Sequence, residues 1–530
     1  MTAHPPPAPA SFQALTPTAY LDRSAVVHRD ATAVVDGERR WTYSEFQDRC
    51  LRQAGMLAEF GAQPGERVAV LAPNTHLMLE SHYGVLYAGC VLVALNVRLS
   101  IEELRYIVGH CDARVLLCAP ELRDIGEAIA SSLPDCRVIS GGAEYESLLA
   151  NAVPARRPVS DERSLMSLNY TSGTTGLPKA VMYHYRGAYL QALAMTVHFS
   201  LDAGAVYLWT LPMFHCNGWT FTWAVTAAGG THVCLPKVDP DEVWRLIAAE
   251  GVTHLCAAPT VLVAIVNSTS AGPIEGRELA VAVGGAPPAP ALLEHCAALG
   301  LSVTHLYGLT ETFGPVAICD WPSAWNDLTA SEQAIRRSRQ GVANVISQQL
   351  RLVDANGADV TDDGHTIGEI AVRGNNLMLG YYRDAEATAL AIPDGWFRTG
   401  DLAVRHPDNY LEIRDRIKDV IISGGENISS VEVEAVLISH PDVLEAAVVA
   451  APHPRWGERP VAWVTLRPGA GASAEELRDH VRQRLAAFKV PDTVTFAELP
   501  KTASGKIRKV ELRDPLWGQY SRVGSVGNPE

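Results

Sequence analysis

A short segment rich in glycine and hydroxyl side chains is the part of this sequence best suited to hold a phosphate. Residues 171 to 179 read TSGTTGLPK and follow a strand-like stretch at 165 to 169. Glycines allow backbone N–H groups to turn towards an anion, hydroxyls add donors, and a lysine adds a positive charge. The segment lacks the G-x-x-x-x-G-K-[ST] register of a Walker A loop. We predict a loop that binds triphosphate; the alternative is a polar turn from strand to helix.

A second polar segment, which reads YGLTET at 307 to 312, follows a later strand. Sheets of α/β proteins bind ligands at the carboxyl ends of their parallel strands. At such a position Tyr307 can stack on a base and Thr310 can bind a phosphate, while Glu311 offers the hard oxygen ligand that Mg²⁺ prefers. Considered alone, the segment is explained equally well as an ordinary helix start.

Asp401 ends a third segment, GWFRTGD at 395 to 401, and directly follows a tight Thr-Gly turn. Its carboxylate is placed there to accept hydrogen bonds from a vicinal diol. The alternative is an Asx turn in which the side chain caps its own backbone. Arg416, in the sequence DRIKD at 415 to 419, is a candidate partner or a simple surface charge.

Lys506 lies in a basic run near the end of the chain, LPKTASGKIRK at 499 to 509. Such a run is usually solvated, and composition alone supports that interpretation. However, Gly505 directly before Lys506 indicates a tight loop that presents one ammonium group. A fixed cation is needed where a carboxylate attacks phosphorus and pyrophosphate leaves, because negative charge builds up there.

A regular alternation of strands and helices must position these segments. It begins with apolar strands at 67–71, 90–95 and 114–118 and helices at 76–89 and after Ser100, and it resumes with strands at 231–235, 254–257, 279–283 and 303–306. Strand, helix, strand in this order predicts parallel sheets with crossover helices. From about residue 341, strands joined by Asn-Gly and Asp-Gly type turns indicate an antiparallel section. After Asp415 the pattern is that of a compact α+β piece, with a capping box at Ser473 and Glu476.

Composition excludes several classes of protein. A chain of 530 residues is too long for one core, and its net charge of -15 argues against a large nucleic-acid interface. The 10 cysteines are scattered without a C-x-x-C pair, which favours reduced, buried thiols in a cytoplasmic protein. We expect neither a signal peptide nor a membrane-spanning segment, since the N-terminus has no apolar core and the most apolar stretch is short.

Together, the four chemical segments resemble those of the adenylate-forming superfamily, which includes acyl-CoA synthetases, luciferases and nonribosomal peptide adenylation domains. The resemblance covers residues 15 to 513. Within the superfamily it is strongest to CoA ligases of short- and medium-chain acids, such as methylmercaptopropionate-CoA ligases and plant acyl-activating enzymes. Two further segments carry this likeness, PMFHCNGW at 212 to 219 and CDWPSAW at 319 to 325, the latter leading into RQG at 339 to 341.

The resemblance implies an α/β fold. A large N-terminal domain would contain two parallel α/β sheets and a β-barrel-like section, and a small mobile α+β C-terminal domain would follow. The implied divisions are a disordered arm (1–14), an AMP- and acyl-binding domain (15–415), a C-terminal domain with the catalytic lysine (416–513) and a tail (514–530). It further implies an enzyme that uses ATP, Mg²⁺ and coenzyme A and forms homodimers.

The resemblance also assigns roles to individual residues. The β- and γ-phosphates would be held by Thr171, Ser172, Gly173, Thr174, Thr175, Gly176 and Lys179. Adenine would be framed by Gly285, Ala286, Pro287, His305, Tyr307 and Gly308, and the remaining nucleotide contacts would come from Thr310, Asp401, Arg416 and Lys506. The catalytic group would be Lys506, Thr310 and Glu311, with Mg²⁺ held by Glu311 and Thr171. Lys418 would be the hinge, and CoA would contact Gly424, Gly425, Glu426, Trp456 and Phe488.

The acyl pocket is expected around His215 and Trp219, with Gly285 and Gly308 also near the acid. His215 and Trp219 are four residues apart, so they share one face if the segment is helical. A bulky Trp219 favours a short or medium acid; the alternative is that Trp219 and Trp223 are core aromatics. The reaction expected is AMP-forming acyl-CoA ligation. Two alternatives remain open: transfer of the acyl group to a carrier-protein thiol (or light production), and a catalytically silent binding protein.

Overall fold

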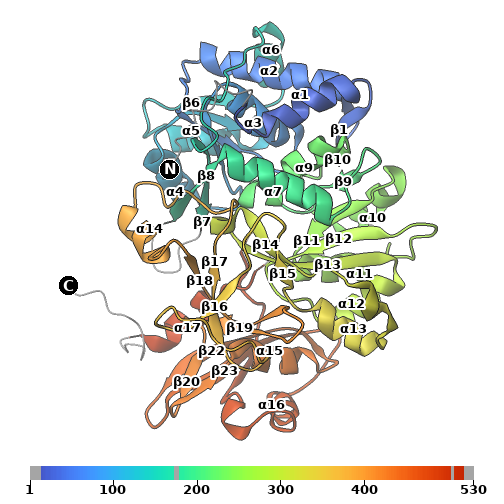
Figure 1. Cartoon of the computed structure of the whole chain (residues 1–530), viewed down its shortest axis with the longest axis vertical. Coiled ribbons are helices and arrows are strands. Elements are labelled where there is room, and N and C mark those ends of the chain that lie inside the picture. The colour runs from blue at the N-terminus through green and yellow to red at the C-terminus, as the bar shows by residue number, and fades with distance from the viewer. Residues whose placement is uncertain (1–12, 172–177, 503–505, 519–530) are drawn as a thin grey trace, which may run out of the picture. The chain divides into compact units, whose positions relative to one another are not determined.

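The computed structural model describes residues 13–171, 178–502 and 506–518 (Figure 1). The chain divides into two compact units, and each is described by itself. Unit 1 is built from Met1–Leu255, Leu309–Gly314 and Gly374–Thr388; unit 2 is built from Cys256–Gly308, Pro315–Arg373 and Ala389–Glu530.

A six-stranded sheet in unit 1 contains the strands on both sides of the predicted triphosphate-binding segment at 171 to 179, which we call the phosphate loop. Its order is β6-β5-β3-β4-β7-β8, in which all neighbours are parallel except β7 and β8. The strands are β3 (Arg67–Leu71), β4 (Val91–Ala94), β5 (Ala113–Cys118), β6 (Arg137–Ser140), β7 (Leu165–Thr171) and β8 (Lys179–His184). Its helices are α3 (His76–Tyr87), α4 (Ile101–His110), η1 (Pro120–Leu122), α5 (Arg123–Ala130) and α6 (Ala143–Asn151). The predicted parallel α/β architecture is confirmed here, and Ser100 caps α4 in a capping box with Glu103.

A second run of strands in unit 1 has the order β2-β1-β10-β9-β11. These strands are β1 (Thr32–Asp36), β2 (Arg39–Thr42), β9 (Val206–Leu208), β10 (Thr231–Val233) and β11 (His254–Ala257), of which β11 ends in unit 2. The accompanying helices are α1 (Thr18–Val27), α2 (Tyr43–Glu59), α7 (Tyr185–His198), α8 (Cys216–Trp219), α9 (Phe221–Ala228) and α10 (Pro240–Ala249). Unit 1 also contains η2 (Thr310–Thr312) and the start of α14 (Ala385–Ala391).

Unit 2 combines a parallel pair with an antiparallel sheet. The strands β12 (Leu279–Val283) and β13 (Leu301–Leu309) are parallel, and β14 (Gly314–Ile318) pairs with β15 (Val342–Ala343). The helices here are α11 (Pro259–Val266), α12 (Pro290–Ala298), η3 (Ser323–Asp327) and α13 (Ala330–Arg337). The section predicted to be antiparallel is a four-stranded sheet of β16 (Arg351–Val353), β17 (Gly368–Val372), β18 (Phe397–Arg405) and β19 (Leu411–Arg416).

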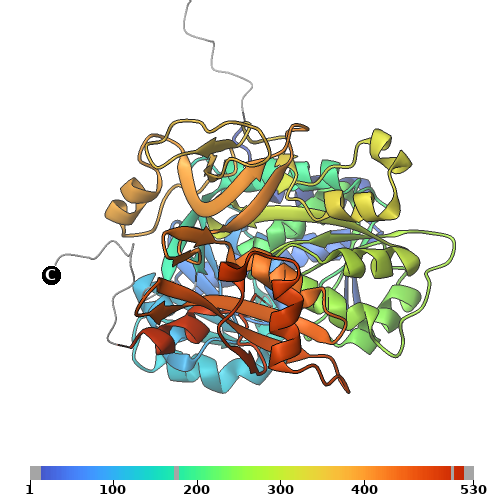
Figure 2. The same ribbon diagram turned by 90° about the horizontal axis from the view of Figure 1, so that it is seen from below.

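The C-terminal part of unit 2 is an α+β section, drawn in orange-red to red in Figure 2. It has its own apolar core. Its sheet contains β20 (Ile421–Ser423), β21 (Glu426–Ile428), β22 (Val443–His453), β23 (Gly457–Leu466) and β24 (Val494–Phe496). The helices α15 (Ser430–Ile438), α16 (Ala474–Arg482), η4 (Ala487–Lys489) and α17 (Lys509–Trp517) complete it. The capping box of Ser473 and Glu476 opens α16, as predicted.

Two global expectations from composition can be compared with the structure. All ten cysteines are buried and free, which agrees with the predicted reduced thiols. Within the part of the chain that the structure describes, no helix is long and apolar enough to cross a membrane.

Candidate active site

The phosphate loop joins two antiparallel strands. Thr171 at the end of β7 is the register partner of Lys179 at the start of β8. The element after the loop is a strand and not a helix, so the alternative of a turn from strand to helix is wrong. Of its predicted phosphate ligands, only Thr171 and Lys179 are described. The others, Ser172, Gly173, Thr174, Thr175 and Gly176, lie outside the described residues.

Lys179 faces an aromatic ring and a carboxylate. Its ammonium nitrogen lies 5.2 Å from the centroid of the Tyr381 ring and 3.6 Å from Oδ2 of Asp384. The side chain is nearly half exposed, at 46%. A lysine with one weak ion pair and an open side chain can leave its partners for a triphosphate at little cost.

Thr310 and Glu311 form the short turn η2 in unit 1. The carbonyl oxygen of Thr310 accepts a hydrogen bond from the Tyr183 hydroxyl at 2.6 Å, and the Cys216 thiol lies 3.7 Å from Oγ1 of Thr310. The Tyr381 hydroxyl donates to Oε1 of Glu311 at 2.9 Å. The turn is thus fixed on three sides, which holds one hydroxyl and one carboxylate in defined positions.

The segment that contains His215 and Trp219 is a left-handed turn. Five consecutive residues have positive φ, namely Cys216 (45), Asn217 (46), Gly218 (61), Trp219 (49) and Thr220 (64). The expectation that His215 and Trp219 share one face of a right-handed helix is therefore wrong. Each non-glycine residue in this conformation costs about 1 kcal/mol or more, so the surrounding structure must enforce the turn.

A buried polar network enforces the turn through Asn217. Its Oδ1 accepts hydrogen bonds from the Ser167 hydroxyl at 2.9 Å and from Nδ2 of Asn169 at 2.7 Å. Its Nδ2 donates to Nε2 of His82 at 3.2 Å. Burial lowers the pKa of His82 to about 4, so this ring is neutral and can accept. Because Ser167 and Asn169 lie on β7, the network ties the turn to the strand that leads into the phosphate loop.

The two tryptophans of this region are both buried and differ in their contacts. Trp223 is fully buried, and its indole nitrogen donates to the His82 carbonyl at 3.2 Å, so it is a core aromatic. Trp219 keeps 7% of its surface exposed and packs against Gly314 so closely that a Cβ there would lie 3.3 Å from the Trp219 Cα. Gly314 follows η2, so the indole lies near the turn that carries Thr310 and Glu311.

In unit 2, Tyr307, Asp401 and Arg416 form a chain of contacts in which Tyr307 and Asp401 are buried and Arg416 is partly exposed. The Tyr307 hydroxyl donates to Oδ2 of Asp401 at 2.7 Å, and Nε of Arg416 lies 2.8 Å from the other carboxylate oxygen. Asp401 and Arg416 are register partners on β18 and β19, and Asp401 is only 3% exposed. The Asp401 side chain therefore does not cap its own backbone, and Arg416 is not a simple surface charge. Each carboxylate oxygen retains a second lone pair with which to accept from a diol.

The residues expected to frame adenine fall into two groups. Gly285, Ala286 and Pro287 form an exposed turn after β12 in which Gly285 has φ +91 and open space where a Cβ would point. By contrast, the His305 ring is buried and its Nδ1 lies 2.9 Å from the carbonyls of both Ser338 and Arg339. Burial lowers the pKa of His305 to about 4, so the ring is neutral and its N–H is committed to these carbonyls. Gly308, next to Tyr307 on β13, is partly exposed.

Lys506 lies in the same charged neighbourhood as Asp401 and Arg416. Its backbone is fixed by reciprocal hydrogen bonds with Thr502, at 2.7 Å and 3.1 Å. Crowding by protein and the positive charges of Arg416 and Lys418 lower the pKa of the Lys506 ammonium group, against the opposing pull of Asp401. Solvent still reaches the exposed side chain, so the shift is smaller than full burial would produce. The structure thus brings together residues that are far apart in the sequence.

The candidate CoA residues gather around a two-residue turn between β20 and β21. Gly424 and Gly425 have φ +61 and +89, as a tight hairpin turn between Ser423 and Glu426 requires. A Cβ on Gly424 would lie 2.8 Å from the Trp456 indole, so only glycine fits beneath this ring. Trp456 is 42% exposed. Arg459 on β23 hydrogen-bonds both the Phe488 carbonyl and, at 3.5 Å, the Ser423 hydroxyl, which places Phe488 near the same turn.

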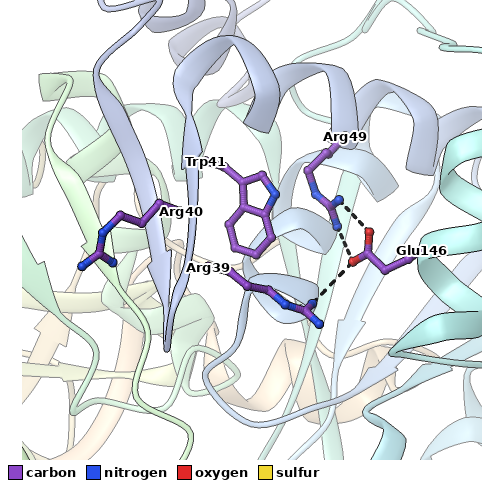
Figure 3. Close-up of a pocket in the computed structure, with 5 residues that line it drawn as sticks. All are labelled: Arg39, Arg40, Trp41, Arg49 and Glu146. Carbon is purple, nitrogen blue, oxygen red and sulfur yellow. Dashed lines mark hydrogen bonds and ion pairs between the residues drawn. The ribbon is translucent and has the colours of Figure 1, made fainter.

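A surface cavity of about 370 Å³ in unit 1 lies at a different position. It is lined by Arg39, Arg40, Trp41, Arg49 and Glu146 (Figure 3). All three guanidinium groups have carboxylate partners: Arg39 and Arg49 pair with Glu146, and Arg40 pairs with Glu250 at 2.8 Å. With its charges paired, the cavity has little net attraction for an anion. None of the predicted site residues lines this cavity. We interpret the charged residues around it as a network of ion pairs that joins β2, α2 and α6.

Several site residues were not anticipated from the sequence. Tyr381 links Lys179 to Glu311, Tyr183 and Cys216 contact Thr310, and Asn217 holds the left-handed turn. The sequence offers one signal for Tyr381, a glycine followed by two tyrosines at 380 to 382, which is typical of a tight turn. Cys216 and Asn217 lie inside the segment at 212 to 219, where only His215 and Trp219 stood out.

Known proteins resemble this chain over nearly its whole length. It is 44% identical over 543 residues to the acetate/butyrate–CoA ligase AAE7, peroxisomal, of Arabidopsis thaliana, with 96% of this chain and 95% of that protein covered. It is 43% identical over 547 residues to the 2-methylpropanoate–CoA ligase CCL4 of Humulus lupulus, with 98% of each chain covered. Among solved structures, ATP-bound MatB from Rhodopseudomonas palustris superposes with a TM-score of 0.85 at 27% identity, covering 96% of this chain and 100% of that one.

Two family models match as well. The model described as "AMP-binding enzyme" matches residues 21–382, and that described as "AMP-binding enzyme C-terminal domain" matches residues 432–506. The first match alone covers more than half of the chain, and the relatives above exceed 40% identity. On this evidence, and in agreement with the resemblance seen in its four chemical segments, the chain belongs to the AMP-binding family of adenylate-forming enzymes.

Proposed function

We propose that this protein is an AMP-forming acyl-CoA ligase that acts on a short- or medium-chain carboxylic acid. The observation that carries the proposal is the gathering of Lys506, Asp401 and Arg416 in unit 2. A diol-binding carboxylate beside two cations is suited to a nucleotide whose α-phosphate is under attack.

The first step is adenylation of the acid. A carboxylate oxygen attacks the α-phosphorus of ATP, the bond between the α-phosphorus and its bridging oxygen breaks, and pyrophosphate leaves with that oxygen. Lys506 offsets the negative charge that builds up at phosphorus. In this proposal, Thr310 contacts the α-phosphate and Asp401 binds the ribose hydroxyls. The β- and γ-phosphates are assigned to Lys179 and the segment before it.

Mg²⁺ is expected to accompany ATP at Glu311. The residues expected at this ion fit it, because the Glu311 carboxylate and the Thr171 hydroxyl are both hard oxygen donors. Tyr381 engages only Oε1 of Glu311, and among the described residues no hydrogen-bond or ion-pair partner of Oε2 is found. When bound, Mg²⁺ would neutralise charge on the phosphates. The residues Glu311 and Thr171 would hold it.

The second step is thioester formation. The sulfur of CoA attacks the acyl carbon of the adenylate, the mixed anhydride bond breaks, AMP leaves, and the thiol proton is released to solvent. We assign the approach of CoA to Gly424, Gly425 and Glu426, with Trp456 and Phe488 beside them. Lys418 is the proposed hinge that exchanges this turn for Lys506 between the two steps. The domain boundaries at 415 and 513 stay predictions.

A short or medium acid is supported by two observations. Trp219 is large, nearly buried and packed beside Gly314, which leaves an acyl chain little room in that direction. The relatives described above are named for acetate, butyrate and 2-methylpropanoate. We place His215, Gly285 and Gly308 near the acid, with His215 as a gate. The Lys506 and Glu311 side chains are both present, which argues against a silent binding protein.

The test is a panel of acids from acetate through octanoate to thioether and aromatic acids. AMP and pyrophosphate release would be measured with and without CoA. We expect CoA-dependent AMP formation with at least one short or medium aliphatic acid. Adenylation that responds to a carrier protein and not to CoA would favour the carrier-loading alternative. No turnover with any acid would sink the ligase proposal. We further propose a cytoplasmic homodimer, for which sedimentation and fractionation are the measurements.

A further inference from the structure

Tyr381 occupies a tightly constrained position in unit 1. It lies between Gly380, with φ +136, and a turn in which Arg383 has φ +59. Its backbone forms an antiparallel bridge with Val181 of β8, and its amide donates to the Thr388 hydroxyl at 2.8 Å. A Cβ on Gly380 would lie 2.7 Å from Thr388, so the approach is close on that side too. Such a position is built to hold one side chain in one place.

The hydroxyl of Tyr381 donates to Glu311, the expected metal carboxylate, at 2.9 Å. A tyrosine hydroxyl is protonated near neutral pH, so it is the donor in this hydrogen bond and the carboxylate is the acceptor. A donor on Oε1 fixes the rotation of the carboxylate and leaves Oε2 as the oxygen that can bind a cation. The amide of Met378 also donates to the Glu311 carbonyl at 2.9 Å, so the same segment holds the backbone of this residue.

The ring of Tyr381 contacts the lysine of the phosphate loop. Lys179 lies over it at 5.2 Å from the centroid and pairs with Asp384 at 3.6 Å. Asp384 belongs to the same turn, because its amide donates to the Tyr381 carbonyl at 3.2 Å. One side chain therefore contacts both the phosphate-loop lysine and the carboxylate of η2.

We propose that Tyr381 is a positioning residue for metal-loaded ATP, whose hydroxyl orients the Glu311 carboxylate towards Mg²⁺ while its ring holds the Lys179 ammonium beside the phosphate site. The proposal rests on the proposed function, in which Glu311 is a ligand of Mg²⁺. The two contacts have different roles in this proposal. The hydroxyl of Tyr381 orients the Glu311 carboxylate, and its ring positions the Lys179 ammonium group.

The test is Tyr381→Phe, which removes the hydroxyl and keeps the ring under Lys179. ATP would be titrated calorimetrically into each protein, in excess Mg²⁺ and again in EDTA, without acid or CoA. A hydrogen bond to a charged group supports a loss of about tenfold or more in the affinity for Mg·ATP. Affinity for metal-free ATP should be unchanged, since the ring remains. Tyr382→Phe is the matched control, and it should change neither affinity.

A second variant guards against a general structural effect. In a Glu311→Gln background, Tyr381→Phe should cause no further loss of Mg·ATP affinity, because the carboxylate to be oriented is gone. Equal losses with and without metal, an unchanged Mg·ATP affinity, or full additivity with Glu311→Gln would each overturn the proposal. These titrations need no acid, so they decide the role of Tyr381 even if every acid in the panel fails.

Discussion

At the scale of single residues, the surroundings of Lys506 change how readily its side chain keeps a proton. A lysine in water holds its proton to high pH, but crowding and the nearby cations Arg416 and Lys418 lower the pKa of this one. The local positive charge is therefore held at some electrostatic cost in the free protein. In the reaction that we propose, the α-phosphate would relieve that cost, so binding of the charged reacting group would be favoured over binding of a neutral one.

Lys506→Ala should separate the two half-reactions. Adenylation should fall by about a thousandfold or more, because the cation opposite the reacting phosphorus is lost. Thioester formation from supplied acyl-adenylate and CoA should stay within a few fold of the wild-type rate. The measurements are pyrophosphate release for the first half-reaction and CoA consumption for the second. Equal loss of both would contradict the division of labour between Lys506 and the Gly424 turn.

The pH dependence of adenylation should carry the signature of the lowered Lys506 pKa. The protonated lysine is the active form, so kcat/KM for ATP should decline as pH rises through that pKa, at a lower pH than an ordinary lysine would give. Lys418→Met removes one of the cations that lower this pKa and should move the alkaline decline to higher pH. Full pH profiles of both proteins would show it. A shift to lower pH in Lys418→Met would be incompatible with this account.

Prediction from the sequence worked well for residues whose side chains do chemistry, and less well for their partners. Asp401 and Arg416 stood out by type and spacing, and the structure pairs them across two strands. His305 shows the limit of such reasoning, because its N–H is used by the carbonyls of Ser338 and Arg339. Tyr381 was missed, since a tyrosine in a turn is unremarkable until its hydroxyl is seen on Glu311.

At the scale of elements, apolar runs bounded by turn residues were predicted accurately. The strands β3, β11 and β12 begin and end at the residues expected, because short buried strands have few alternatives. The left-handed turn at 216 to 220 could not be predicted. Positive φ at four non-glycine residues contradicts local preference, and the partners that enforce it, Ser167, Asn169 and His82, are distant in sequence.

Asn217 should therefore be critical to stability as well as to the site. Asn217→Ala removes the acceptor and donor of the network and places alanine at positive φ, which should cost roughly 3 kcal/mol of unfolding free energy. Asn217→Gly loses the same hydrogen bonds, but glycine adopts positive φ without strain. The glycine variant should therefore be about 1 kcal/mol more stable than the alanine variant. Urea unfolding of the three proteins is the measurement. An alanine variant as stable as the glycine variant would show that the turn is not strained.

At the scale of the whole molecule, the sequence predicted the succession of parallel α/β sheets, an antiparallel section and a C-terminal α+β piece. The last has its own apolar core, with Ile421, Val448 and Leu477 among its fully buried members. What the sequence could not supply was the grouping of distant segments, such as the inclusion of residues 374–388 in unit 1. That grouping depends on pairing with β8, which no local pattern encodes.

The native protein should be almost inert to thiol reagents. All ten cysteines are buried, and burial raises the pKa of Cys216 to about 12, so little thiolate exists near neutral pH. An Ellman titration should detect close to no reactive thiol in the folded protein and all ten after denaturation in urea. Rapid reaction of one or more native thiols would indicate that a described core region opens readily in solution.

The backbone is held in place on both sides of Lys418. The ladder of β18 and β19 runs one residue past Arg416, where the Ile417 amide donates to the Gly400 carbonyl at 2.9 Å. On the other side, Arg513 contacts the Lys418 carbonyl at 3.4 Å and the Asp419 carboxylate at 3.1 Å. Because contacts hold the backbone on both sides, movement at this position is confined to the backbone torsion angles of Lys418 itself. If Lys418 is the hinge that we propose, the movement between the two half-reactions is a rotation about this one residue, with few alternative paths.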